Sequence, residues 1–397
     1  MTLVTLPPTN LSRSEPEFPR SPTLPSPRGP ITERLLDHLV GPPHELASWP
    51  DPPDDPLTGD DSGLALYLCY ELHYQGLPGV DEAWEWEPTL LRERQRLERA
   101  LEDRLAEVIG PAPLGVSPAA TVMALRDLAG ADGGPSLSTH VEERGTLTEL
   151  RELAIHRSAY QLKEADPHTW GIPRLTGGSK AALVDIQYGE YGDGQPQRMH
   201  ATLFATTMRD LGLDDRYGAY LDRLPGITLT TTNVISIFGL HRRRRGALLG
   251  HLALFEMCSV VPMGRYARAF RRLGLPERAI AFYDEHVIAD ERHQHVAIED
   301  LVCGLLRLEP ELGGDIIHGA RTLAAVEAAF ADQVLDAWAR GTTSLRPAGP
   351  PAFEQTDDGE HQSGSSPLSA TPRQRAFGAF QGPITPSART GAGRRVG

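Results

Sequence analysis

Cysteine, basic side chains and long apolar runs are all scarce in this sequence. The three cysteines, Cys69, Cys258 and Cys303, are odd in number and form no Cys-x-x-Cys pair, which excludes a disulfide framework and indicates a reducing compartment. The formal charge of −14 at pH 7 excludes a general nucleic-acid binder, because neutralising phosphates requires clustered Lys and Arg. No stretch approaches the roughly 18 apolar residues of a membrane helix, and the chain does not begin like a secretory leader. We therefore expect a cytoplasmic protein without a membrane partner.

One basic run, HRRRR at residues 241–245, stands out against this acidic background. An isolated run of this kind is typical of a solvated helix start or a turn between two helices. Its other interpretation is a contact surface for a partner protein.

Proline is concentrated at both ends of the chain. Residues 1–60 combine many prolines with few aromatic residues, and Pro, Gly, Ser, Thr and Gln dominate from about Leu345 onward. Such segments bury too little apolar surface to offset the entropy lost on ordering. We therefore expect disorder in residues 1–60 and 343–397, with a globular domain at residues 61–342.

The globular part carries helical patterns and few strand signals. Apolar residues recur three and four apart throughout it, which predicts an all-α fold. Residues 61–145 form a helical subregion, and residues 146–342 form the core. Thr146 and Glu149 have the spacing of a capping box, so the first core helix begins there and continues until Pro167. The other helices are expected at about residues 63–76, 88–109, 179–188, 197–211, 229–240, 243–263, 276–305 and 313–339.

The segment YDEHVIADERHQH carries the strongest chemical signal. His286, Asp290 and His293 stand at positions i, i+4 and i+7, so on a helix all three side chains project from one stripe. Two imidazoles and a carboxylate suit a transition metal such as Fe(II), Mn(II) or Zn(II), whereas an all-oxygen set would suit Mg or Ca. The alternative is a solvated helix face, which also collects such residues.

Glu256 is unusual because it sits in ALLGHLALFEMCSVVPM, a helix that is apolar almost all round. An ionised carboxylate buried there costs several kcal/mol unless it is paired or binds a metal. The sequence leaves two interpretations open, a metal ligand or an ion pair with one of Arg242–Arg245.

Three further candidates precede this helix. Glu164 falls on the inward stripe of the first core helix, where Arg157 either neutralises it or anchors a substrate carboxylate beside it. Glu190 and His200 are ten residues apart, which does not place them on one helix face. The Gly and Pro residues between them allow a break that aims both side chains inward.

The combined set predicts more than its members do. Carboxylates and histidines that converge from separate helices on the core of a bundle describe how di-iron and di-manganese carboxylate sites are built. The ferritin-like version needs Glu-x-x-His on two helices, and this chain offers only Asp290-x-x-His293. A ferritin-like fold is therefore disfavoured.

The order and spacing of these residues resemble the haem-oxygenase-like di-iron oxidases and oxygenases, a family of iron-containing redox enzymes. Glu164 is followed after 26 residues by Glu190, after ten by His200 and after 56 by Glu256, and the stripe of the later helix follows. The resemblance covers about residues 60–342. The segments that carry it are KEADPHTW (163–170), QYGEYGDGQPQRMH (187–200), HLALFEM (251–257) and YDEHVIADERH (283–293).

This resemblance implies a bundle of about seven core helices that binds two irons without haem and reacts with O2 as co-substrate. The implied ligands of one iron are Glu164, His286 and Asp290, and those of the other are His200, Glu256 and His293. Glu190 is implied as an additional or bridging ligand.

The resemblance also implies the type of reaction. Some members of the family N-oxygenate amines or guanidines, and others cleave or decarboxylate amino or fatty acids. The extra carboxylate Glu190 favours N-oxygenation. We therefore expect a small amine, amino acid or fatty-acid-like substrate and an external electron donor, and a homodimer is compatible with the sequence. Arg157, His156, His168 and Tyr283 are candidates for the pocket around the metals.

Two other functions remain open at this point. A metal-free helical binding or regulatory module could use the basic run or the Pro-rich ends to contact partners. A haem-binding oxygenase would require a proximal His, and nothing in the Pro-rich start suggests one.

Overall fold

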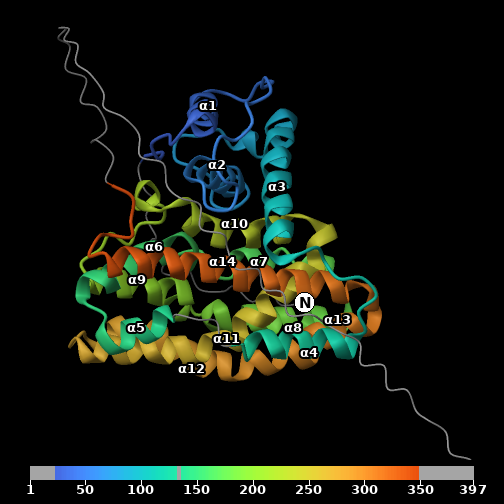
Figure 1. Cartoon of the computed structure of the whole chain (residues 1–397), viewed down its shortest axis with the longest axis vertical. Coiled ribbons are helices and arrows are strands. Elements are labelled where there is room, and N and C mark those ends of the chain that lie inside the picture. The colour runs from blue at the N-terminus through green and yellow to red at the C-terminus, as the bar shows by residue number, and fades with distance from the viewer. Residues whose placement is uncertain (1–22, 132–135, 348–397) are drawn as a thin grey trace, which may run out of the picture. The chain divides into compact units, whose positions relative to one another are not determined.

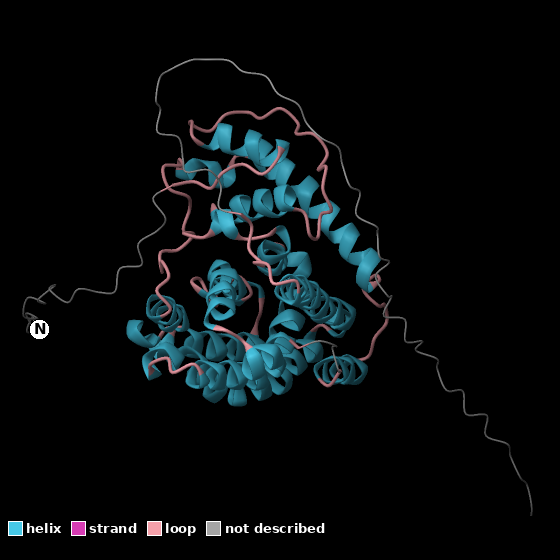
Figure 2. Ribbon diagram, turned by 60° about the vertical axis from the view of Figure 1, so that its left-hand side comes forward, coloured by secondary structure: helices cyan, strands magenta, loops and turns pink. Residues whose placement is uncertain are grey.

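The computed structural model describes residues 23–131 and 136–347, and these contain helices and no strands (Figures 1 and 2). The predicted all-α class is confirmed. In chain order the helices are α1 (Pro30–Leu39), α2 (Asp60–Glu71), α3 (Pro88–Ile109), α4 (Pro118–Ala129), α5 (Leu137–Arg144), α6 (Leu147–Gln161), α7 (Asp166–Thr169), α8 (Gly177–Glu190), α9 (His200–Asp210), α10 (Gly226–Leu240), α11 (Arg245–Arg272), α12 (Glu277–His295), the π-helical segment η7 (Val296–Val302), α13 (Cys303–Leu308) and α14 (Gly313–Ala339).

The longest helix, α11, lies at the centre of the bundle. It packs against α12 on one side and α14 on another, and α9 packs against α12 while α8 packs against η7. Seven helices of eleven or more residues make up this core: α6, α8, α9, α10, α11, α12 and α14. Because α8, α9, α11 and α12 also carry the predicted metal ligands, the same packing that builds the core brings those residues together.

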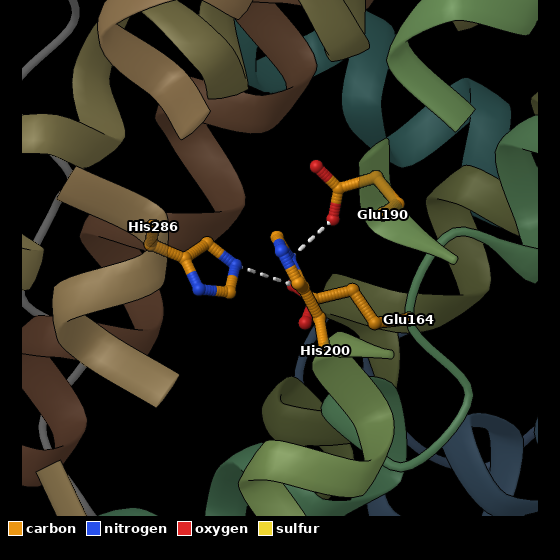
Figure 3. Close-up of side chains that lie close together, drawn as sticks. All are labelled: Glu164, Glu190, His200 and His286. Carbon is orange, nitrogen blue, oxygen red and sulfur yellow. Dashed lines mark hydrogen bonds and ion pairs between the residues drawn. The ribbon is translucent and has the colours of Figure 1, made fainter. Parts of the chain in front are cut away.

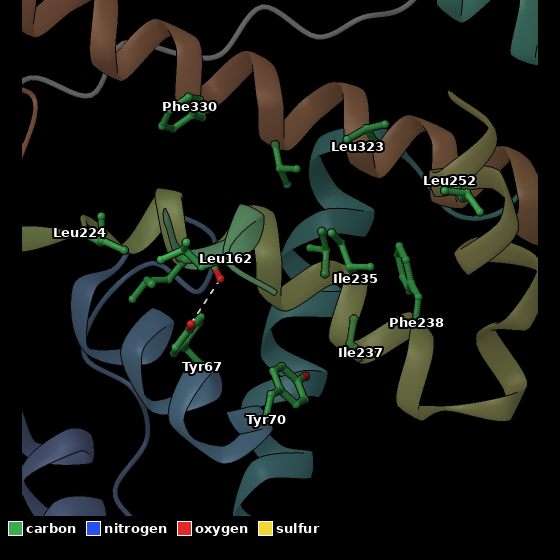
Figure 4. Packing of buried hydrophobic residues seen from close by; sticks show 14 of the residues in the cluster. Tyr67, Tyr70, Leu162, Leu224, Ile235, Ile237, Phe238, Leu252, Leu323 and Phe330 are labelled. Carbon is green, nitrogen blue, oxygen red and sulfur yellow. Dashed lines mark hydrogen bonds between the residues drawn. The ribbon is translucent and has the colours of Figure 1, made fainter. Parts of the chain in front are cut away.

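Helix α10 joins the core to the N-terminal helices, and it contacts α2 on one side and α14 on the other. Figure 4 shows Ile235 and Phe238 of α10 among the buried side chains of this layer, with Tyr67 from α2 and Phe330 from α14. Burial of such side chains is worth about 1.5–3 kcal/mol each. The subregion and the core therefore share one hydrophobic interior.

Residues 23–60 differ from the expected disorder. Pro30 begins α1, a position where a missing amide hydrogen has no cost, and Ile31, Leu35 and Leu39 are buried. The Asp61 carboxylate accepts hydrogen bonds from the backbone amides at the start of this helix. The prediction for this stretch was wrong, because a high proline content is also compatible with helix starts and ordered extended connections. Residues 1–22 lie outside the described residues.

The C-terminal boundary also moves. Ser344 and Leu345 are buried, and Arg346 forms an ion pair with Asp60. The packed part of the chain thus extends a few residues beyond the predicted end at residue 342. Residues 348–397, where disorder was also expected, lie outside the described residues.

Two predictions about helix ends need correction. The capping box at Thr146 and Glu149 is present, but α6 ends at Gln161, so Glu164 lies in the turn before α7 and not in a helix. Ala165 takes a positive φ of 75° there, which a continuing helix does not allow. The single helix expected at about residues 276–305 also divides, since η7 separates α12 from α13.

The basic run forms the turn between α10 and α11, as predicted. Arg243 and Arg244 both pair with Glu102 of α3, and Arg244 also reaches Asp315 of α14. Arg245 pairs with Glu309. These arginines therefore connect helices to one another, and none of them pairs with Glu256.

One helix among the described residues, Arg242–Arg272, is long and apolar enough to cross a membrane by length and composition alone. Within its most apolar window, 67% of the residues are buried inside the protein. That burial matches its position at the centre of the bundle.

Candidate metal centre

The seven predicted ligand residues lie together in the core, and all are buried. They come from five parts of the chain that are separated in sequence: Glu164 from the turn between α6 and α7, Glu190 from the end of α8, His200 from the start of α9, Glu256 from α11, and His286, Asp290 and His293 from α12. The stripe expected on α12 faces the bundle interior, which argues against a solvated helix face.

The potential ligand atoms form two groups, each within 4.8 Å, and both groups contain Glu190. The first group is Glu164, Glu190, His200 and His286, and the second is Glu190, Glu256, Asp290 and His293. This grouping differs from the one that the resemblance implied, because His200 and Asp290 exchange places. His200 belongs with Glu164 since the break after α8 brings the first residue of α9 to that side.

The first group is shown in Figure 3. Nδ1 of His200 lies 2.7 Å from Oε2 of Glu190, and Nε2 of His286 lies 3.4 Å from Oε1 of Glu164. Nδ1 of His286 lies 2.8 Å from the backbone oxygen of Phe282. Because a carbonyl only accepts, that contact fixes the proton on Nδ1 and leaves Nε2 free to bind a metal, as is usual for histidine ligands.

The second group surrounds His293. Nδ1 of His293 is 3.3 Å from Oε1 of Glu190, 3.6 Å from Oε2 of Glu256 and 3.6 Å from Oδ1 of Asp290. Oγ of Ser259 on α11 donates a 2.5 Å hydrogen bond to the other Asp290 oxygen, Oδ2. This bond orients Asp290 from the neighbouring helix.

Several of these atoms lack the partners that buried polar atoms normally have. Nδ1 of His200 and Nδ1 of His293 are buried without a hydrogen bond, although each lies close to a Glu190 oxygen. Oε2 of Glu164 is buried and unpaired as well. Orphaned atoms of this kind are rare in native interiors. Their convergence, with carboxylate oxygens and imidazole nitrogens as donors, fits bound iron.

The electrostatics also favour bound cations. Burial raises the pKa of Glu256 to about 8; the contact with His293 lowers it in part, and the charges of Asp290 and Glu190 raise it. Burial lowers the pKa of His293, but its contacts with the same three carboxylates outweigh burial and raise the pKa to about 12. Without metal, then, protons must neutralise this group. Two divalent cations would balance the charge of the four carboxylates.

A small cavity lies against both groups of potential ligands. Five of the seven potential ligands line it, and the remaining wall includes Tyr160, His168, Gln187, Leu252 and Phe255. Its free space for a water-sized molecule is about 10 Å³, roughly enough for one water. A small molecule bound here would lie beside the metal-facing carboxylates.

Only one of the four predicted pocket residues lines this cavity. His168 does, and its Nε2 lies 3.3 Å from Nδ1 of His251. His156 instead contacts Thr228 and Ser344 through its two ring nitrogens. Its position on α6 faces α10 and the segment after α14, and it is not among the residues that line the cavity.

Arg157 and Tyr283 also point elsewhere. Arg157 donates two parallel hydrogen bonds of 2.8 and 2.7 Å to Glu327 of α14, so it neither neutralises Glu164 nor remains free to anchor a substrate. Tyr283 packs against Phe270 and Tyr266. Both predictions relied on helical stripes, which do not show which neighbouring helix a side chain meets.

Sequence reasoning missed three residues that shape the site. Gln187 stands three positions before Glu190 on α8 and shares its face. Ser259 stands three positions after Glu256 on α11. Lys163, next to Glu164, is fully buried and pairs with Glu71. Gln187 and Ser259 could have been found from their i, i+3 spacing to a predicted ligand. The sequence carries no signal for Lys163, because lysines are mostly exposed.

Two comparisons with known proteins concern this part of the chain. The family model described as iron-containing redox enzyme matches residues 151–328, a range that contains all seven potential ligands. The chain is also similar to a nitrosourea synthase from Streptomyces achromogenes subsp. streptozoticus, with 22% identity over 204 residues. That match covers 50% of this chain and 43% of the relative, so the chain matches less than half the length of that protein.

Proposed function

We propose that this chain, whose residues 151–328 match the iron-containing redox enzymes and whose described residues form an all-α bundle, binds two non-haem irons and uses O2 to oxidise a small nitrogen-bearing substrate. The oxidoreductase class follows from the family. The number of irons, the use of O2 and the substrate class are parts of the proposal.

The observation that carries the two-iron proposal is the shared carboxylate. Glu190 belongs to both groups of potential ligands, and its oxygens face different histidines, Oε2 toward His200 and Oε1 toward His293. A carboxylate placed this way can bridge two metal ions. Adjacent iron ions supply electrons to O2 in sites of this kind, and a carboxylate-rich ligand set favours their oxidised form.

The chain's own residues prepare this site. The Phe282 carbonyl orients His286, and Ser259 orients Asp290. Leu252 and Phe255 give the cavity an apolar wall that limits water near the metals, which protects a reactive oxidant from side reactions.

Two observations support nitrogen oxidation over chemistry on a carboxylate. The described residues that line the cavity include neither Lys nor Arg, so a fatty-acid or amino-acid carboxylate would meet no cationic side chain there. The similar nitrosourea synthase is named for a nitrogen-containing product. An electron donor that restores the ferrous state is proposed as a partner, and no macromolecular partner is needed for the chemistry.

O2 uptake tests the proposed function. Protein loaded anaerobically with Fe(II) is mixed with O2 alone and with small amines, guanidines, amino acids and fatty acids. We expect uptake that requires iron and that amines or guanidines accelerate. Glu256→Gln should abolish it, whereas Glu291→Gln, at an exposed position of α12, should not. If neither the wild-type protein nor Glu291→Gln takes up O2, the proposal is contradicted.

A further inference from the structure

Gln187 holds a fixed orientation beside the two ligand groups. Its Nε2 donates to the backbone oxygen of Ala165 at 2.8 Å and to Oγ1 of Thr169 at 2.6 Å. Because a backbone carbonyl can only accept, the bond to Ala165 places the nitrogen on this side, and the amide cannot turn over without losing that bond. Thr169 is fixed in turn by Tyr191, whose hydroxyl lies 2.9 Å from Oγ1.

This orientation leaves the other end of the amide unpaired. Oε1 of Gln187 is buried and has no hydrogen-bond partner, and Gln187 as a residue is 3% exposed. An unpaired buried acceptor is unfavourable, so this oxygen needs a partner that the described chain does not supply. Gln187 lines the cavity together with Glu164 and Glu190, on the same helix face as Glu190.

The charges around the cavity define what can enter it. Arg157 of α6 and Lys163 of the turn after it are both paired with other residues: Arg157 with Glu327, and Lys163 with Glu71. Four carboxylates and two divalent metals together carry no net charge. The cavity therefore offers a hydrogen-bond acceptor to an incoming molecule, and its described lining includes neither Lys nor Arg.

We propose that Oε1 of Gln187 determines substrate specificity by accepting a hydrogen bond from an N–H of the substrate, an amine or guanidine, and so holds that nitrogen beside the metals. This inference rests on the proposed function and narrows its substrate class. A carboxylate has no hydrogen to donate at neutral pH, so it leaves the oxygen unpaired and adds an uncompensated negative charge.

Calorimetry under anaerobic conditions tests this proposal on Fe(II)-loaded protein, with iron content measured first. The probes are methylguanidine, which carries N–H donors, and acetate, which carries none. The variants are Gln187→Leu and the matched control Gln195→Leu, at an exposed glutamine of the connection after α8. We expect both variants to retain iron. The affinity for methylguanidine should fall roughly three- to tenfold in Gln187→Leu alone, the effect of losing one hydrogen bond.

The outcomes separate the two proposals. Wild-type protein that takes up no iron contradicts the proposed function. If iron-loaded Gln187→Leu binds methylguanidine with unchanged affinity, the role proposed for Gln187 is contradicted and the proposed function is not. Iron loss in Gln187→Leu but not in Gln195→Leu would show that this oxygen serves the metal site, and overturns the proposal. If Gln187→Leu does not fold, the wild type decides: acetate binding as tightly as methylguanidine overturns the proposed selectivity.

Discussion

Glu190 and His200 are brought within contact by the break between α8 and α9: Oε2 of Glu190 lies 2.7 Å from Nδ1 of His200. This nitrogen is buried and makes no hydrogen bond. Two potential ligands this close, without a hydrogen bond between them, point at a common centre. The other Glu190 oxygen lies by His293, so this residue joins the two groups.

Glu190→Gln should therefore reduce iron binding more than the substitution of a ligand that belongs to only one of the two groups. We expect fewer than one iron per chain in Glu190→Gln and about one in Glu256→Gln, because an amide replaces a charged ligand at both positions while only Glu190 serves both groups. Metal analysis after anaerobic loading and desalting measures this. The control Glu291→Gln should keep the wild-type iron content. Equal losses in the Glu190 and Glu256 variants would contradict a shared role for Glu190.

Gly189→Ala should displace a ligand without removing one. A Cβ at position 189 would lie 2.8 Å from Nε2 of His293, closer than such contacts allow, so the imidazole must shift. Because ligand geometry is held within fractions of an ångström, we expect iron affinity to fall by roughly tenfold or more. Gly178→Ala on the same helix is the control, since its Cβ meets nothing within 4 Å. Similar iron affinities of the two variants, measured by competition with a chelator, would refute the predicted effect.

Ser259→Ala should weaken metal binding through Asp290. The 2.5 Å hydrogen bond from Ser259 to Oδ2 orients this carboxylate, and loss of a partner of this kind typically costs 10- to 100-fold in metal affinity. The same chelator competition measures the change. Ser259→Thr, which keeps a hydroxyl, should recover part of the affinity, and an affinity in Ser259→Ala equal to that of the wild type would exclude an orienting role.

Lys163 and Glu71 form a buried ion pair that links the metal-binding turn to α2. Their side chains are 0% and 1% exposed, Tyr217 donates a 2.6 Å hydrogen bond to Glu71, and the Lys163 ammonium lies 4.4 Å from the ring centre of Tyr74. Removing one partner leaves a buried charge unpaired, so Lys163→Met should lower the free energy of unfolding by about 3–5 kcal/mol.

Urea denaturation of the metal-free protein measures this loss. The double variant Lys163→Met/Glu71→Gln should lose less than the single variant, because it leaves no unpaired charge. Arg126→Met breaks an exposed pair with Glu299, where both side chains are 62% exposed, and should cost less than about 1 kcal/mol. If the buried and exposed pairs cost the same, the buried pair does not anchor the turn.

The sequence predicts most of the core and part of the site, for reasons that individual residues illustrate. Helical period places His286, Asp290 and His293 on one face, and the structure has them there, because three residues on one helix need only local geometry. Glu256 is predicted as a candidate ligand because an unpaired buried charge is costly. Arg157 shows the limit of both arguments, since its partner Glu327 lies 170 residues away in the chain.

The features that the sequence does not predict lie mostly in loops and short helices. Glu164 sits in a turn whose left-handed residue is Ala165, and alanine gives no sign of such a conformation in the sequence. The assignment of His200 to the group of Glu164 depends on how the chain returns after α8. Helix α1 was not predicted, because composition alone does not distinguish a proline that begins a helix from one in a disordered segment.

Diffraction at the iron absorption edge tests the central claim most directly. For crystals of the protein grown anaerobically with Fe(II), we predict two anomalous peaks in each chain, roughly 3.5–4 Å apart, with the Glu190 carboxylate between them and His200 and His293 on opposite sides. A single peak, no peak, or peaks away from Glu190 would contradict a two-iron centre at this position.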